Sequence, residues 1–103
     1  DRVGHDLLGF QVAQVDDGEV IGSVKESASR DNAVAVAIAL NGHGPRTFWF
    51  HFGDITVGPN DDRRPVRAIV DLTNGERHPV EWGGVRLTIN PTDDPALLFR
   101  CET

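Results

Sequence analysis

The stretch AVAVAIAL, residues 33–40, decides how this chain of 103 residues folds. Large aliphatic residues occupy its even positions and alanine occupies every odd one. In an extended strand successive side chains point to opposite faces, so this spacing gives one face of large side chains and one of methyl groups. We predict a strand whose large residues, Val34, Val36 and Ile38, face the core.

A helix over residues 31–41 is the alternative for the same stretch. Asp31 or Asn32 would cap such a helix and Asn41-Gly42 would end it, which would make the fold α+β. We favour the strand, because three β-branched residues at a spacing of two do not form a helical stripe.

Turn residues on both sides of this stretch indicate further strands. Asp16-Asp17-Gly18 separates apolar segments at 8–15 and 19–24, and Asn74-Gly75 separates alternating segments in the second half, so each predicts a hairpin. In a type I′ turn both Asn74 and Gly75 would need positive φ. Pro79 lacks an amide donor, so we expect it on an edge strand or at a bulge.

The whole pattern predicts a mainly β fold, a small antiparallel barrel or sandwich of about eight short strands. We expect one compact domain over residues 1–103, and if it has two sub-units they meet at the polar loop 58–64. The predicted core is Phe10, Val12, Val34, Val36, Ile38, Phe48, Phe50, Val66, Val70, Val80, Trp82, Val85, Leu87 and Leu98.

Composition limits the classes of partner. With 16 acidic and 10 basic residues the net charge is −6, which disfavours binding to nucleic acid or to anionic lipid. The longest apolar run has eight residues, against the roughly 20 needed to span a bilayer, so we expect no membrane span. The single cysteine, Cys101, cannot form a bridge within the chain, which favours the cytoplasm. Because the chain starts at Asp1 without a signal peptide, we expect a processed product or an excised domain.

A cluster of arginines is the first candidate site. Arg63, Arg64 and Arg67 lie close together in the sequence, and the hairpin at Asn74-Gly75 should bring Arg77 near them. Guanidinium groups bind phosphates and carboxylates with paired donors, so the patch would suit an anionic small molecule or a nucleotide. The alternative is that these arginines pair with nearby carboxylates on a solvated face, namely Asp61, Asp62, Asp71 and Glu76.

Trp49 and His51 are the second candidate. They alternate with Phe48, Phe50 and Phe52, so they must point to the opposite face of the same strand. If that face is exposed it is an aromatic interaction surface. We favour its burial against the alanine face of residues 33–39, which leaves room for an indole.

Histidines supply the third candidate. A metal-dependent enzyme would use His43, His51 or His78, and His51 with Asp54 is the closest pair of possible ligands. The four histidines, His5 included, match no known metal-site spacing, and no serine or cysteine lies in a nucleophile context. We therefore expect no catalytic residues, no metal and no cofactor.

Two segments of the chain resemble parts of known small domains. Residues 8–57, with the turn Asp-Asp-Gly-Glu-Val-Ile-Gly and the closing Phe-Gly-Asp-Ile, resemble small barrels of the PRC-barrel and Tudor kind. Arg63 and Arg67, at the Arg-x-x-x-Arg spacing, and Gly83-Gly84 are similar to PilZ domains, a resemblance that implies binding of cyclic dinucleotides. The second PilZ motif is one residue short here, so neither family is assigned.

Taken together, these features favour a non-catalytic protein-interaction module, one domain of a larger bacterial protein. It would bind a protein partner or a second copy through a strand edge or the aromatic face. Binding of an anionic small molecule is the first alternative and a metal-dependent enzyme is the second.

Overall fold

The computed structural model describes residues 10–27, 32–40, 44–59 and 61–103. These residues form strands and turns and contain no helix. In chain order the strands are β1 (Phe10–Ala13), β2 (Val20–Glu26), β3 (Ala33–Ala39), β4 (Arg46–His51), β5 (Thr56–Val57), β6 (Arg64–Pro65), β7 (Ala68–Asp71), β8 (Arg77–Pro79), β9 (Gly84–Ile89) and β10 (Ala96–Glu102). The mainly β prediction is confirmed, and the helix alternative for residues 31–41 is wrong because β3 is a strand.

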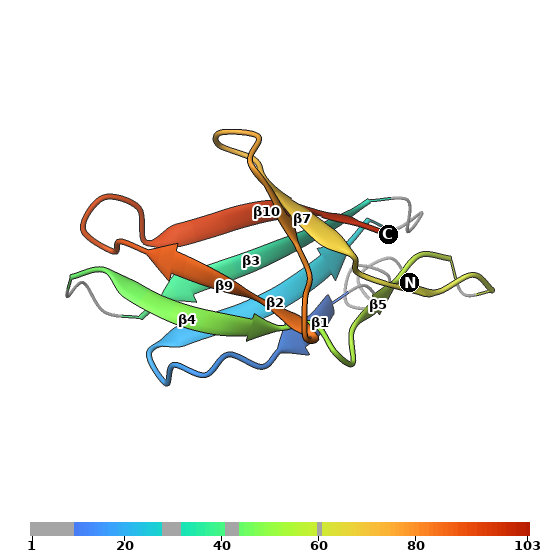
Figure 1. Ribbon diagram of the computed structural model, residues 1–103, viewed down its shortest axis with the longest axis horizontal. Helices are drawn as coiled ribbons and strands as arrows, with labels where there is room; N and C mark the ends of the chain where they lie inside the picture. The colour runs from blue at the N-terminus through green and yellow to red at the C-terminus, as the bar shows by residue number, and fades with distance from the viewer. Residues whose placement is uncertain (1–9, 28–31, 41–43, 60) are drawn as a thin grey trace, which may run out of the picture.

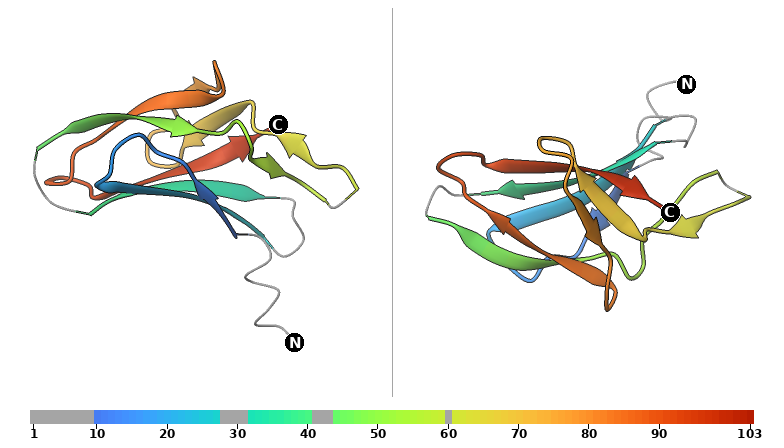
Figure 2. Two further views of the ribbon diagram at one scale, coloured as in Figure 1. Left: turned by 90° about the horizontal axis from the view of Figure 1, so that it is seen from below. Right: turned by 45° about the horizontal axis from the view of Figure 1, so that its top comes forward.

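Six strands form the main sheet, in the order β1-β2-β3-β10-β7-β8, and every pairing is antiparallel. The β4–β9 pair lies over one face of this sheet, and the short β5–β6 pair extends from one end (Figures 1 and 2). An isolated bridge between Val15 and Phe50 joins the chain after β1 to β4. Among the described strands no sheet closes into a barrel.

The inward face of β3 is the reverse of the predicted one. Ala33, Ala35 and Ala37 are buried, whereas Ile38 is 43% exposed and the two valines between are half-buried. The alanines share a core with the rings of Phe48, Phe50, Phe52 and Phe99. Methyl groups leave the volume that those rings fill, because a close-packed core needs small residues opposite large ones.

This reversal explains most errors in the predicted core. Five of its members are buried, namely Phe48, Phe50, Val66, Val85 and Leu87. Four are half-buried, namely Val34, Val36, Val70 and Val80. Four are wrong because they are exposed, namely Val12, Ile38, Trp82 and Leu98. The side chain of Phe10 lies outside the described residues.

The predicted hairpins form, with different turn geometry. Asp16-Asp17-Gly18 connects β1 to β2, and Asn74-Gly75 lies between β7 and β8. Asp71 donates its amide to the carbonyl of Glu76, so the second loop has four residues, 72–75. Of the pair Asn74-Gly75 only Gly75 has a positive φ, 77°. The expected type I′ turn at Asn74-Gly75 is therefore wrong.

The edges of the main sheet are β1 and β8. Pro79 lies in β8, as expected for a residue without an amide donor. In the described part of the chain no helix has the length and apolar character needed to cross a bilayer.

Candidate binding surfaces

The outer face of the main sheet, defined as the face opposite the core, carries large apolar side chains. Strand register places Val12, Ser23, Val36 and Leu98 in one row across four strands. A neighbouring row holds Ile21, Ile38 and Ala96. Side chains opposite each other on adjacent strands point to the same face, so these rows form one surface that is apolar except at Ser23, which is itself buried.

The large apolar residues on this surface have high exposed fractions. Val12 is 76% exposed, Ile21 50%, Ile38 43% and Leu98 45%. Single exposed apolar residues are ordinary, but a contiguous group of them is typical of an interaction site.

A third row on the same face is basic. Lys25, Val34, Arg100, Val70 and Arg77 follow one another across five strands. Glu102 bridges to both arginines, at 2.9 Å to Arg77 and 3.4 Å to Arg100. The row therefore holds three cations and one adjacent carboxylate, in a chain whose net charge is −6.

The four arginines of the predicted patch have different surroundings. Arg64 is exposed and pairs with Asp62 at 3.1 Å, and Arg77 pairs with Glu102. Arg67 is exposed, and within the described residues its side chain makes no ion pair. Arg63 instead binds internal groups, so it is not free to hold a ligand.

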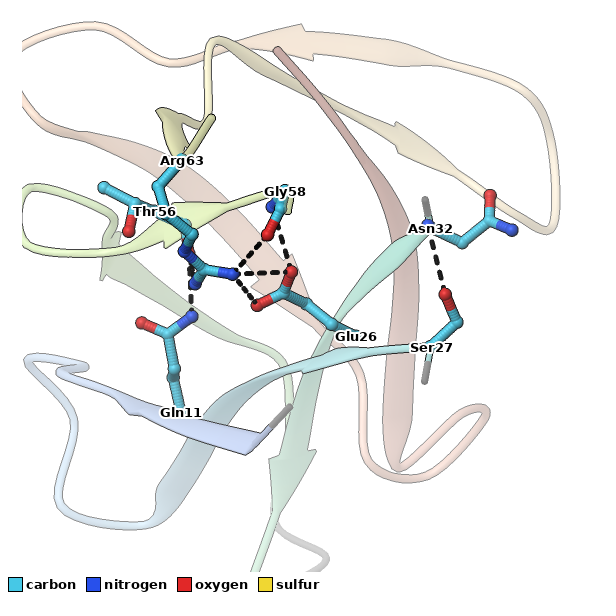
Figure 3. Close-up of polar contacts among 7 residues, drawn as sticks. All are labelled: Gln11, Glu26, Ser27, Asn32, Thr56, Gly58 and Arg63. Carbon is cyan, nitrogen blue, oxygen red and sulfur yellow. Dashed lines mark hydrogen bonds and ion pairs between the residues drawn. The ribbon is translucent and has the colours of Figure 1, made fainter. Parts of the chain in front are cut away.

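Arg63 fastens the β5–β6 loop to β2 (Figure 3). Its guanidinium pairs with Glu26 at 2.9 Å and donates to the carbonyls of Gly58 and Thr56. Glu26 also accepts the amide of Gly58 at 2.9 Å, and its side chain is only 1% exposed. A buried carboxylate needs such partners because its desolvation is costly. The sequence offered no signal for this pair, whose members are 37 residues apart.

Trp49 and His51 lie on the outer surface of β4 and are half-buried. Their rings meet edge to face, with centroids 6.3 Å apart. The indole lies over Gly84 of β9, where an added Cβ would contact the Trp49 ring and lie 2.6 Å from the carbonyl oxygen of Phe50. The alanine face of β3 is buried with the phenylalanines, so the expected pairing of that face with Trp49 is wrong.

The candidate metal ligands are separated. His78 contacts Phe99 edge to face, at 5.9 Å between centroids, while His51 lies beside Trp49 on another sheet. His5 and His43 lie outside the described residues. Across the described ranges, no three His, Cys, Asp or Glu residues are grouped in a way that would hold a metal ion.

The sequence matches no known protein-family model, and a comparison with curated proteins gave no match. The likenesses to PRC-barrel, Tudor and PilZ domains remain local.

Cys101 faces a pocket of about 370 Å³ that is also lined by Asp62 and Arg64. Burial, together with the nearby charge of Glu26, raises the pKa of the thiol to about 12, although a hydrogen bond with the backbone of Ala35 acts in the opposite direction. A thiol with so high a pKa is a poor nucleophile at neutral pH, because the thiolate is the reactive form.

Sequence reasoning missed a second pocket, here called the Trp82 pocket. It has a volume of about 370 Å³, and its lining includes Val12, Gln14, His51, Asp54, Ile55 and Trp82. His51 and Asp54, the predicted pair, thus both line this pocket. Trp82 was expected in the core, yet it is 94% exposed and has a φ of 58°.

Trp82 owes its position to a tight turn. Glu81 pairs with Gly84, and the two residues between them, Trp82 and Gly83, have φ values of 58° and 78°. Two positive φ values at the centre of a two-residue turn are typical of type I′. The turn thus begins one residue before the Gly83-Gly84 pair.

Proposed function

We propose that this chain is a non-catalytic protein-interaction module, a small, half-open β sandwich within a larger bacterial protein of the cytoplasm. The partner binds to the outer face of the main sheet. The observation that carries the proposal is the continuous apolar surface there, led by Val12, Ile21, Ile38 and Leu98 at 43–76% exposure.

Charge on this face specifies the chemistry of the partner. The basic row of Lys25, Arg100 and Arg77 borders the apolar rows. A matching partner presents apolar side chains followed by carboxylates. Apolar burial supplies most of the affinity, whereas the charges set orientation and speed up association.

Self-association about a twofold axis parallel to the strands is less favourable than binding of a different protein. Two copies packed face to face about a twofold axis parallel to the strands would place the basic rows against each other, and like charges in contact oppose binding. A partner of complementary charge avoids this repulsion.

Binding of an anionic small molecule is the second candidate. Its support is Arg67, which is exposed and makes no ion pair with any described residue, and Arg64, which lines the pocket beside Cys101. Arg63, Arg64 and Arg77 already pair with carboxylates, so Arg67 is the one member of the predicted patch that makes no ion pair with a described residue.

Variants of the outer face test the main proposal by quantitative capture of partners from a lysate of the source cells, followed by mass spectrometry. Ile21→Thr with Ile38→Thr removes apolar surface and keeps β-branched residues, and Lys25→Glu reverses one charge of the basic row. Each should reduce capture of the same protein by about tenfold or more, which is equivalent to about 1.4 kcal/mol.

Arg86→Glu is the matched control, because Arg86 is exposed on β9 of the other sheet. It should leave capture unchanged. The proposal fails if all variants and the unaltered domain retain the same proteins, or if sedimentation shows that the outer-face variants abolish a stable dimer instead.

A further inference from the structure

The Trp82 pocket combines an aromatic surface with a single charge. Asp54 is the only carboxylate that lines it, and no lysine or arginine does so among the described residues. We propose that this pocket binds the guanidinium group of an arginine side chain carried by a protein partner.

The backbone at Trp82 is the first argument. A positive φ is unfavourable for a residue with a large side chain, and Asn, Asp or Gly is preferred at this turn position. Burial of the side chain does not offset this backbone cost, since Trp82 is 94% exposed. An outlier that the fold does not need points to a function for the side chain itself.

The second argument is the fixed placement of the turn against the pocket. Phe52 donates its amide to the carbonyl of Gly83 at 2.8 Å. A Cβ built on Gly83 would lie 3.9 Å from the Cα of Gly53. The two turns that carry Trp82 and Asp54 are thus held side by side, so one ligand can reach the indole and the carboxylate together.

The chemistry of these two groups selects arginine. A guanidinium is planar and weakly hydrated, so it stacks on an indole face while donating paired hydrogen bonds to a carboxylate. An ammonium is a compact, strongly hydrated charge and uses the flat surface less well. The net charge of −6 adds a favourable long-range field for a cation.

That the arginine comes from a protein rests on the proposed function. Val12 links the two sites, because it belongs both to the outer face and to the pocket lining. A partner that covers the outer face would reach the pocket at the β1 edge. The pocket is nevertheless testable by itself, with a small probe that does not need the outer face.

The probe is N-acetyl-arginine amide, titrated into the unaltered chain and followed by the indole N–H signal of Trp82 in a nitrogen-proton NMR spectrum. The chain has two tryptophans, so the signal that disappears in Trp82→Asn identifies it. We expect saturable shifts with a millimolar dissociation constant, as suits one exposed cation–π contact and one charged hydrogen bond.

N-acetyl-citrulline amide, the neutral counterpart of the probe, and Asp54→Asn should each weaken binding by about tenfold. Asp61→Asn removes the same charge outside the pocket and should not change it. Trp82→Asn should abolish binding while the domain stays folded.

Equal binding of the arginine and citrulline probes would overturn the proposal, because the pocket would then recognise a neutral planar group. Binding unaffected by Trp82→Asn or Asp54→Asn would overturn it as well. The free probe could bind while a partner that carries an arginine and is captured through the outer face leaves the indole N–H signal of Trp82 unshifted. In that case the ligand is a small cation and not a protein, which overturns the proposal. If the probe binds and outer-face variants leave partner capture unchanged, only the proposed function fails.

Discussion

Glu26 and Arg63 form an ion pair at 2.9 Å in which the carboxylate is 1% exposed and the guanidinium 24%. The pair joins β2, which lies in the main sheet, to the loop between β5 and β6 (Figure 3). Its position makes it a connection between two parts of the fold that share no strand pairing.

Arg63→Ala should lower the free energy of unfolding by about 3 kcal/mol, because it leaves a buried carboxylate without its cation. Urea denaturation measures the change. Arg64→Ala is the control, since Arg64 and Asp62 are both more than half exposed, and such pairs contribute about 0–1 kcal/mol. Equal losses in the two variants would contradict the assignment of Arg63 as the internal contact.

Trp82→Asn should raise the free energy of unfolding by about 1 kcal/mol, because asparagine tolerates the left-handed conformation at this turn. In a domain of this size that corresponds to a melting temperature about 4–8 °C higher. Trp82→Ala lacks the short polar side chain through which asparagine tolerates a positive φ, so it should bring little of this gain. Calorimetry separates the two, and a lower melting temperature for Trp82→Asn would show that the indole stabilises the fold.

Ala37→Val and Ile38→Thr test which face of β3 is inside. Ala37 is fully buried, so two added methyl groups should overpack the core and cost about 1–3 kcal/mol. Ile38→Thr on the outer face should cost less than about 1 kcal/mol. The reverse order of the two losses, measured in urea, would mean that the large residues of this strand face inward.

The thiol of Cys101 should be almost inert in the folded protein. With a pKa of about 12 against 9.0 for an ordinary cysteine, its thiolate at pH 8 should be about a thousandfold scarcer than in the unfolded chain. Labelling with a disulfide reagent should therefore be slow in buffer and fast in denaturant. Comparable rates in the two conditions would show that the thiol is accessible and ordinary.

The same raised pKa has a consequence for stability. The folded state holds the thiol proton up to about pH 12 and the unfolded state releases it near pH 9. The contribution of this group is complete below pH 9 and is lost as the pH rises toward 12. The free energy of unfolding should accordingly fall over this alkaline range, and Cys101→Ser should reduce the slope.

Much of the fold was predictable from period-two alternation and turn residues. The alternation at 33–40 identified a strand, and Asp-Asp-Gly and Asn-Gly located hairpins. The inward face of β3 was not predictable, because a strand with apolar residues on both faces carries no signal for which face is buried. The size of the phenylalanines on β4 decided it, and that is a property of two distant segments together.

The candidate sites were less predictable. His51 and Asp54 both line the Trp82 pocket, in agreement with the prediction from their spacing that they lie close together. The third component, Trp82, is predicted in the core because it follows Val80 at the spacing of two that places both side chains on one face of a strand. Arg63 was assigned to a ligand patch, since its partner Glu26 is remote in sequence and only the folded structure brings the two together.

Pro79 affects the tendency of this domain to aggregate at high concentration. Its strand, β8, has three residues and forms one border of the main sheet. A border this short, with one amide missing, is a poor template for a strand from another molecule. The domain can therefore display a broad apolar sheet face while this border resists growth into fibrils, so Pro79→Thr should aggregate sooner on storage than the unaltered chain.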